Sequence, residues 1–224
     1  MKVFSLLAPR GALFAAAGVA LLVCLIASCA AALTVEGTAR VEFSRTYQFL
    51  VRDCNAEAAA AVSGEVSSLG GAGYYLQAEG ESAVVLAVYP DEASAYSVLD
   101  GMKDEAEGVR LLALAAQPFS VRGGAEQAAR VLSQLRTLDT CASLLYRAAN
   151  GLATGEFSQA EARAAADGVR RVLEGLAASS GEGAIGDLAE ECRSLASGIL
   201  FSRDVRRVQA EICAKIVSAH EIFA

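Results

Sequence analysis

TYQFLVRDCNAEAAAAVSGEVSSLGGAGYYLQAEGESAVVLAVYP, residues 46–90, is the stretch that decides the fold. Its first seven residues alternate large apolar and polar side chains and are rich in aromatic and branched residues, which predicts a strand over 46–52. The alanine-rich segment that starts at Asn55 and stops at Gly70-Gly71 predicts a helix, with Asp53 or Asn55 as its N-cap. Residues 73–78 and 82–89 flank a glycine-containing turn and predict a β-hairpin.

The chain on the C-terminal side of this stretch completes a recognisable order of elements. Pro90 ends the last strand of the hairpin, and Asp91 is placed to cap a helix that runs to about Asp104. Apolar residues recur at three-to-four spacing on one face of that helix, and residues 108–114 predict a final strand. The order β-α-β-β-α-β is the split βαβ arrangement, so the sequence predicts an α+β, ferredoxin-like domain over residues 44–118.

From Ala125 onward the hydrophobic pattern becomes wholly helical. One long helix is expected to stop at Asn150-Gly151, and Ser158 with Glu161 forms a capping box that opens a second. A third amphipathic segment begins near Ile185 and continues to the C-terminus. Residues 119–224 therefore predict an α-helical hairpin or three-helix bundle. The side chains expected to face inward from its second helix are Val169, Val172, Leu173 and Leu176.

The first 33 residues have the layout of a membrane segment. Residues 11–33 form an unbroken apolar run, and a helix of that length spans roughly 34 Å, enough for a bilayer core of about 30 Å. Lys2 and Arg10 precede the run and acidic residues follow it, which predicts a cytoplasmic N-terminus and an extracytoplasmic remainder. Residues 34–43 read as a polar linker behind this anchor.

Three fates of this segment are compatible with the sequence. It can persist as a transmembrane helix, or be removed as a signal peptide at the small residues 27–30. Alternatively, Ile26-Ala27-Ser28-Cys29 resembles the lipobox of bacterial lipoproteins, which implies lipidation of Cys29. Tethering at the bacterial cytoplasmic membrane is the expected role.

Composition excludes some classes of function. Beyond residue 33 the chain has 17 basic and 26 acidic side chains and no basic cluster, so it would repel a nucleic-acid backbone. The cysteines of this part permit two disulfides, although buried thiols are the favoured interpretation. With one histidine in the chain and no CxxC pair, neither a metal nor another cofactor is expected. The four cysteines concerned are Cys54, Cys141, Cys192 and Cys213.

Catalytic signatures are not apparent either. The chain has no GxSxG, HExxH or Walker motif. His220 lies near the C-terminus on a predicted helix end, where a solvated role is expected. The glycines of residues 70–73 follow a helix and precede a strand, the reverse of a phosphate-binding loop, and predict a helix stop. The sequence therefore predicts a protein that is not an enzyme.

Three motifs in the β-α-β-β-α-β segment resemble the SPOR (sporulation-related repeat) domain. They are Gly70-Gly71-Ala72-Gly73-Tyr74, the strand end Val88-Tyr89-Pro90, and the helix start Asp91-Glu92-Ala93-Ser94-Ala95. The resemblance covers about residues 44–116. It implies a βαββαβ fold, an N-terminal membrane tether and binding to the glycan strands of peptidoglycan, as part of cell division or sporulation.

A glycan would be expected on a sheet face that the two helices of this domain leave open. If Tyr47, Phe49 and Val51 face those helices, the polar residues that alternate with them line the open face. The candidates for contacting the glycan are Gln48, Arg52, Tyr75, Gln77 and Arg110.

The alternative hypothesis is a scaffold or assembly protein of the envelope that contacts other proteins. Leu50, Arg52 and Cys54 stand where the family has glutamine, glycine and phenylalanine, which favours this alternative. In the first hypothesis the helical bundle packs on the SPOR-like domain or recruits an envelope partner. In the alternative, both the sheet and the bundle contact other proteins.

Overall fold

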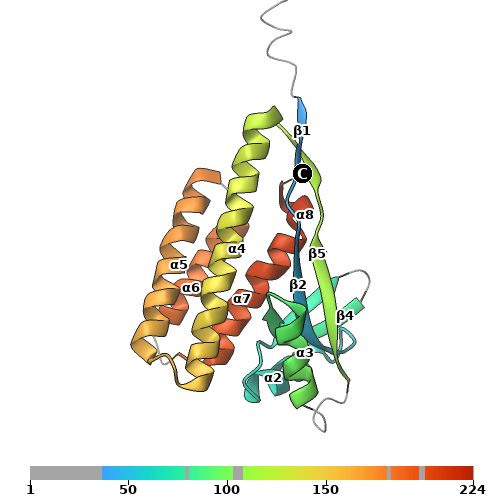
Figure 1. The fold of residues 1–224 in the computed structure, drawn as a ribbon, viewed down its shortest axis with the longest axis vertical. Helices are drawn as coiled ribbons and strands as arrows, with labels where there is room; N and C mark the ends of the chain where they lie inside the picture. Colours follow the sequence, from blue (N-terminus) through green and yellow to red (C-terminus); the bar gives the residue numbers. More distant parts are fainter. Residues whose placement is uncertain (1–36, 79–80, 103–107, 181–182, 197–199, 224) are drawn as a thin grey trace, which may run out of the picture.

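The computed structural model describes residues 37–78, 81–102, 108–180, 183–196 and 200–223. The predicted anchor (1–33) and the candidate lipidation site Cys29 lie outside these residues. Within them, no helix is both long enough and apolar enough to span a membrane. The fold is α+β, with an antiparallel sheet region followed by a helical region (Figure 1).

The main sheet has the strand order β3-β4-β2-β5, and every neighbouring pair is antiparallel. Its strands are β2 (Arg45–Asp53), β3 (Tyr74–Ala78), β4 (Glu81–Tyr89) and β5 (Val109–Ala116). The register of β2 on β4 shifts between Leu50 and Val51, so β4 has one extra residue there. All four strands were predicted from the sequence to within about two residues.

Helices α2 (Ala59–Ser68) and α3 (Glu92–Gly101) connect these strands in the predicted β-α-β-β-α-β order. Asp91 is the N-cap of α3, as predicted, because its Oδ1 accepts a hydrogen bond from the Ser94 backbone N–H at 2.8 Å. Helix α2 stops at the expected glycines, where Gly70 adopts a φ of 90°. Its start at Ala59 is later than the sequence indicated.

A short strand lies within the expected linker (34–43). Residues Thr38–Val41 form β1, which pairs antiparallel with β6 (Phe119–Arg122). The linker interpretation is wrong here because Val41 and Phe43 are buried apolar side chains of the core, and β1 packs on the first bundle helix. This small sheet closes the end of the molecule where the C-terminus also lies (Figure 1).

The helical region has more helices than the three predicted. It comprises α4 (Gly124–Thr154), α5 (Gln159–Ser180), α6 (Gly183–Ala196), α7 (Ser202–Val217) and the short α8 (Ala219–Phe223). The predicted capping box is present at α5, where Glu161 Oε2 accepts from the Ser158 N–H at 2.8 Å. The predicted third helix is divided before α7, and Gln159 bonds both the N–H and the carbonyl of Leu200 in the connection. Val172 was expected to face inward but is 41% exposed.

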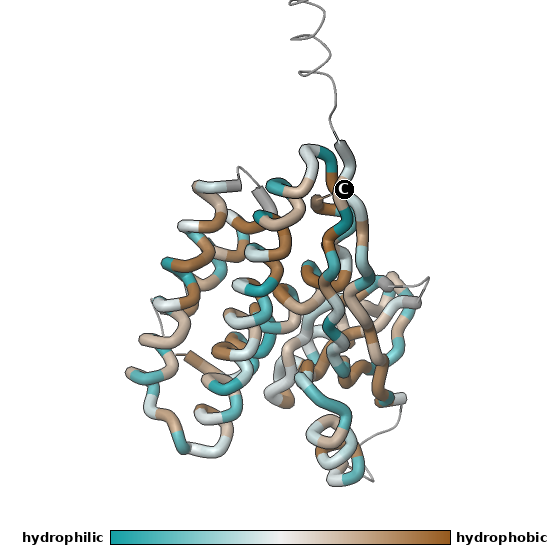
Figure 2. The backbone as a smooth tube through the Cα atoms, turned by 45° about the horizontal axis from the view of Figure 1, so that its top comes forward, coloured by the Kyte–Doolittle hydropathy of each residue, from teal (hydrophilic) through white to brown (hydrophobic). Residues whose placement is uncertain are grey.

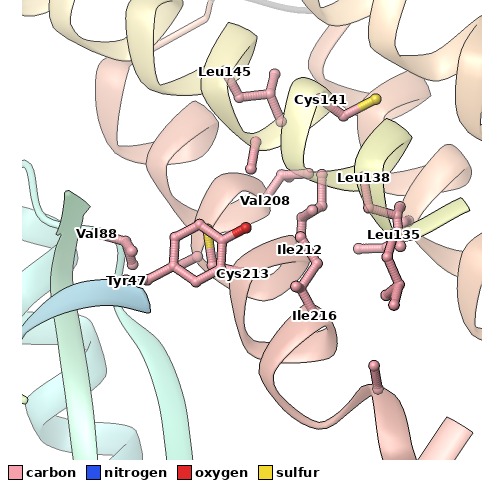
Figure 3. Close-up of a cluster of buried hydrophobic side chains, with 14 of the residues drawn as sticks. Tyr47, Val88, Leu135, Leu138, Cys141, Leu145, Val208, Ile212, Cys213 and Ile216 are labelled. Carbon is pink, nitrogen blue, oxygen red and sulfur yellow. The ribbon is translucent and has the colours of Figure 1, made fainter. Parts of the chain in front are cut away.

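The sheet and the bundle share one hydrophobic core. Phe49 and Val51 of β2 belong to the same buried cluster as Leu135 of α4 and Ile212 of α7. Figure 3 shows Tyr47 and Val88 of the sheet against side chains of α7 and α4. Hydrophobic and hydrophilic residues alternate along the bundle helices (Figure 2), as expected for helices that bury one face.

This arrangement corrects the expected orientation of the sheet. Tyr47, Phe49 and Val51 face the bundle and not α2 and α3. A second, smaller cluster contains Leu50, Ala87 and Tyr89, and α3 covers it. Both faces of the sheet are therefore covered by helices.

Polar bonds fix the bundle on the sheet. The Tyr47 hydroxyl donates to Asp139 Oδ1 of α4 at 2.8 Å, and Arg45 lies 3.2 Å from the same carboxylate. The buried Gln209 side chain of α7 donates to the Val88 carbonyl at 3.0 Å. Because each of these groups is partly or fully removed from water, the bonds specify one position of the bundle on the sheet.

Candidate functional site

A groove lies between α2 and α3 on the sheet face opposite the bundle. Its volume is about 450 Å³, and its lining combines sheet, α2, α3 and one residue of α7. Apolar side chains and polar or charged groups contribute about equally to the lining. We call it the α2–α3 groove, and its lining side chains include Leu50, Val66, Leu69, Leu86, Val98, Met102 and Val109.

Hydrophobic side chains are exposed on the helices beside this groove. Leu69 is 79% exposed at the C-terminal end of α2, and Val98 of α3 is 40% exposed. Tyr96, also on α3, is 48% exposed but does not line the groove. Large apolar side chains gathered around a hollow are typical of a surface that contacts another molecule.

Two arginines and one glutamate supply the charge of the groove. Arg52 of β2 lies 2.7 Å from Glu65 of α2, and both side chains remain partly exposed. Arg206 of α7 donates to the Gly70 carbonyl at 3.0 Å, and Arg203 donates to the Ser67 carbonyl at 3.4 Å. Cations at the C-terminal carbonyls of α2 complement its helix dipole. The groove therefore has two arginines and one glutamate among its apolar lining residues.

Tyr89 connects the groove to the bundle. Its ring packs edge-on against Tyr146 of α4, with the ring centroids 6.0 Å apart. Burial raises the pKa of the Tyr89 hydroxyl, and the nearby Arg206 opposes that shift. Tyr89 is therefore a neutral hydrogen-bonding group at the groove wall at physiological pH.

The structure does not bring the five predicted glycan-binding residues together on an open face. Arg52 lines the α2–α3 groove, and it shares its sheet face with the half-buried Gln48. Tyr75 and Gln77 alternate with the bundle-facing Tyr74 and Leu76, and the Tyr75 hydroxyl donates to Ser82 Oγ at 3.0 Å.

Arg110 lies elsewhere, opposite Val51 in the sheet register, and its Nε donates to Asp53. The expectation of one open face is wrong because the bundle occupies the face opposite α2 and α3. Whether any of the five residues contacts a glycan stays a prediction.

Two lining residues of the groove, Leu69 and Arg206, were not among the site residues predicted from the sequence. Leu69 had a visible signal, since it is a large apolar residue between Ser67-Ser68 and Gly70, where a helix ends in solvent. No sequence signal pointed to Arg206, because it reaches the end of α2 only through the packing of α7. Arg206 and its partner Gly70 are 136 residues apart in the chain.

The remaining candidates for chemistry are the acidic side chains, His220 and the cysteines. Among the described residues, no group of three or more His, Cys, Asp and Glu side chains is placed to hold a metal ion. His220 is exposed on α8, beside Glu221. Cys141, Cys192 and Cys213 are buried free thiols, as predicted, and Cys54 is a half-buried free thiol.

The chain was compared with protein-family models, curated proteins and solved structures. No protein-family model, curated protein or solved structure matches this chain.

Proposed function

We propose that this chain is a non-enzymatic assembly protein of the bacterial cell envelope, held at the membrane by residues 1–33, which binds a partner protein in the α2–α3 groove. The observation that carries the proposal is the exposure of Leu69 at a groove whose lining also holds the apolar side chains of Leu50, Leu86 and Val98. An exposed leucine at the rim of such a hollow lowers the free energy of a complex that covers it.

The position of the groove supports this role. Helices α2 and α3 lie at the end of the molecule away from β1, where the described chain begins (Figure 1). A tether attached ahead of β1 would hold that end near the membrane and leave the groove turned outward. The groove would then be accessible to a second envelope protein.

The lining also defines the chemistry of the partner. Apolar side chains of a helix or an extended segment would fill the space above Leu50 and Leu86, while an acidic side chain would pair with Arg52 or Arg206. Although the chain outside the anchor is acidic overall, these two arginines give the groove positive charge that favours an acidic side chain of the partner at this place.

Photocrosslinking in cells tests this proposal. A photoreactive residue in place of Val98 is expected to give a defined crosslinked product with an envelope protein, and Leu69→Asp is expected to reduce its yield about tenfold, which corresponds to about 1.4 kcal/mol. The same reactive residue at Leu144, which is similarly exposed on α4, is the matched control. A product from position 144 but none from position 98, or no effect of Leu69→Asp, contradicts the proposal.

Glycan binding is the second candidate, favoured by the presence of Arg52 and Tyr89 at the same groove. A guanidinium and an aromatic side chain are suited to hydrogen-bonding and contacting a sugar. Residues 34–224, which contain all the buried core residues of the described part of the chain, can be sedimented with purified peptidoglycan before and after amidase treatment. Glycan binding predicts a larger bound fraction after treatment, which Arg52→Ala abolishes. Protein in the supernatant in both cases excludes it.

A further inference from the structure

Strand β5 lies at one edge of the main sheet. It pairs with β2 in a regular register, and on its other side no strand of the described residues pairs with it. Figure 1 shows β5 along the side of the molecule away from α5. Proteins commonly protect such an edge with proline, lysine or a β-bulge. β5 has no proline, no lysine and no register shift, so its edge is open to another strand.

The hydrogen-bond pattern shows which backbone groups of β5 point outward. The Asp53 backbone N–H donates to the Gly108 carbonyl at 3.3 Å, so these opposite residues form a hydrogen-bonded pair at the start of the ladder. Since such pairs alternate in an antiparallel ladder, the even-numbered residues of β5 bond β2, and the odd-numbered residues direct their N–H and C=O groups away from it. The outward set is Val109, Leu111, Ala113 and Ala115.

The side chains along this edge are apolar and incompletely covered. Leu112 packs on the cluster shared with the bundle, Leu111 packs on the smaller cluster beneath α3, and both are only half-buried. On α3, the exposed Tyr96 lies about 100° around the helix from the buried Ala95, on the flank away from Val98 and the groove. Because α2 packs over β3 and β4, that flank of α3 is turned toward β5. An aromatic ring and two leucines therefore flank the open backbone groups.

β5 is complementary in size to a second β5 that runs antiparallel to it. Its larger side chains are at its start, and three of its last four residues are alanine. A two-fold axis at Leu112 sets Leu111 of one copy opposite Ala113 of the other, and Val109 opposite Ala115. Opposite residues share a face of the sheet, so each large side chain meets a small one. These are also the residues with outward backbone groups, so each pair can exchange two hydrogen bonds.

Charge is compatible with the same register. Arg110 is the one charged residue of β5, and its Nε donates to Asp53 of its own copy. The two-fold axis sets Arg110 opposite Leu114, so the two Arg110 residues are about 14 Å apart along the strands. Like charges therefore do not face each other across the pair. The strand fits a second copy of itself in both size and charge.

We propose that two copies of this chain pair through antiparallel β5 strands, about a two-fold axis at Leu112, and form one continuous sheet. The axis is normal to the sheet, so both bundles lie on one face and both α2–α3 grooves lie on the other. The two β1 strands are then at opposite ends, and both tethers reach one membrane when the sheet lies along it. With the bundles toward the membrane, the dimer presents two grooves outward. The pairing does not depend on what the groove binds.

Disulfide trapping of the full chain in the membrane tests this register. Leu112→Cys is expected to give a disulfide-linked dimer at a yield about tenfold above that of wild type, whose own cysteines set the background, because opposite residues at a non-hydrogen-bonded site have Cα atoms about 4.5 Å apart. Ala113→Cys, exposed and one residue away, is the matched control. Its two Cα atoms would be about 8 Å apart, too far for a disulfide. A yield from Leu112→Cys no greater than that from Ala113→Cys overturns the proposal.

Sedimentation of the full chain in detergent micelles measures the same pairing without an added thiol. Ala113→Lys is expected to raise the dimer Kd about tenfold, because each lysine lies at the edge opposite Leu111 of the other copy and near the other lysine. Ala113 is exposed, so the fold should be retained, which urea unfolding checks. Leu144→Lys, on the exposed side of α4, is the matched control and should keep the wild-type Kd. A monomeric wild type, or an unchanged Kd in Ala113→Lys, contradicts the pairing.

Discussion

Phe49→Ala is expected to lower the free energy of unfolding by about 3–5 kcal/mol, and to destabilise the sheet and the bundle together. Phe49 is fully buried in the cluster that joins β2 to α4 and α7. Removing its ring leaves a cavity between the two layers, which neither layer can fill without moving away from the other. Urea unfolding followed by circular dichroism, with hydrogen exchange of β2 and α7 peptides, measures both effects.

Leu69→Ala is the control for this variant. Leu69 is 79% exposed, so its truncation should change stability by less than about 0.5 kcal/mol. The idea of a single shared core would be refuted if Phe49→Ala unfolded the sheet while α4 and α7 kept their wild-type protection.

Gly73→Ala is the second substitution with a large expected effect, a loss of about 3 kcal/mol. Gly73 has a φ of 61°, a left-handed conformation that costs an L-residue about 1–2 kcal/mol. A Cβ atom there would lie 2.0 Å from Ser67 Oγ and 2.9 Å from the Ser63 carbonyl oxygen. The Ser67 hydroxyl can rotate away, but the Ser63 carbonyl belongs to α2, so the added methyl group displaces that helix at a further cost of about 1–3 kcal/mol.

Gly70→Ala separates the two contributions. Gly70 also has a positive φ, of 90°, but no atom lies within 4 Å of the position that its Cβ would take. We expect this variant to lose only the conformational part, about 1–2 kcal/mol. Equal losses in Gly70→Ala and Gly73→Ala, measured by urea unfolding, would show that the contact with α2 does not contribute.

Local patterns predicted the sheet region well because they depend on neighbouring residues. The Asp91 carboxylate caps α3 by accepting from the Ser94 backbone N–H, and Ser158 at the start of α5 bonds the Glu161 side chain. Each partner is three residues away, so no distant contact is needed to define these helix starts. The missed strand β1 is different. Its four residues form a strand only because β6, about 80 residues later, supplies the pairing partner.

The candidate site was less predictable. Alternation along β2 shows that Gln48, Leu50 and Arg52 share a face, but not which helices cover it. Leu50 is fully buried, so this face of the sheet is also covered. In the sequence, the one indication of this was an apolar residue between the polar Gln48 and Arg52 on the same face. The α2–α3 groove depends on the spacing of two helices and on Arg206 of α7, which no local pattern specifies.

By itself, the sequence determined the β-α-β-β-α-β order and the amphipathic helices that follow, because strand alternation, caps and helical spacing act over a few residues. Only the tertiary structure decided that the bundle covers the face with Tyr47 and Phe49 and that α2 and α3 leave a groove. Each of these features arises from packing between segments distant in the chain. Their positions follow from burying the apolar faces of all helices and strands at once.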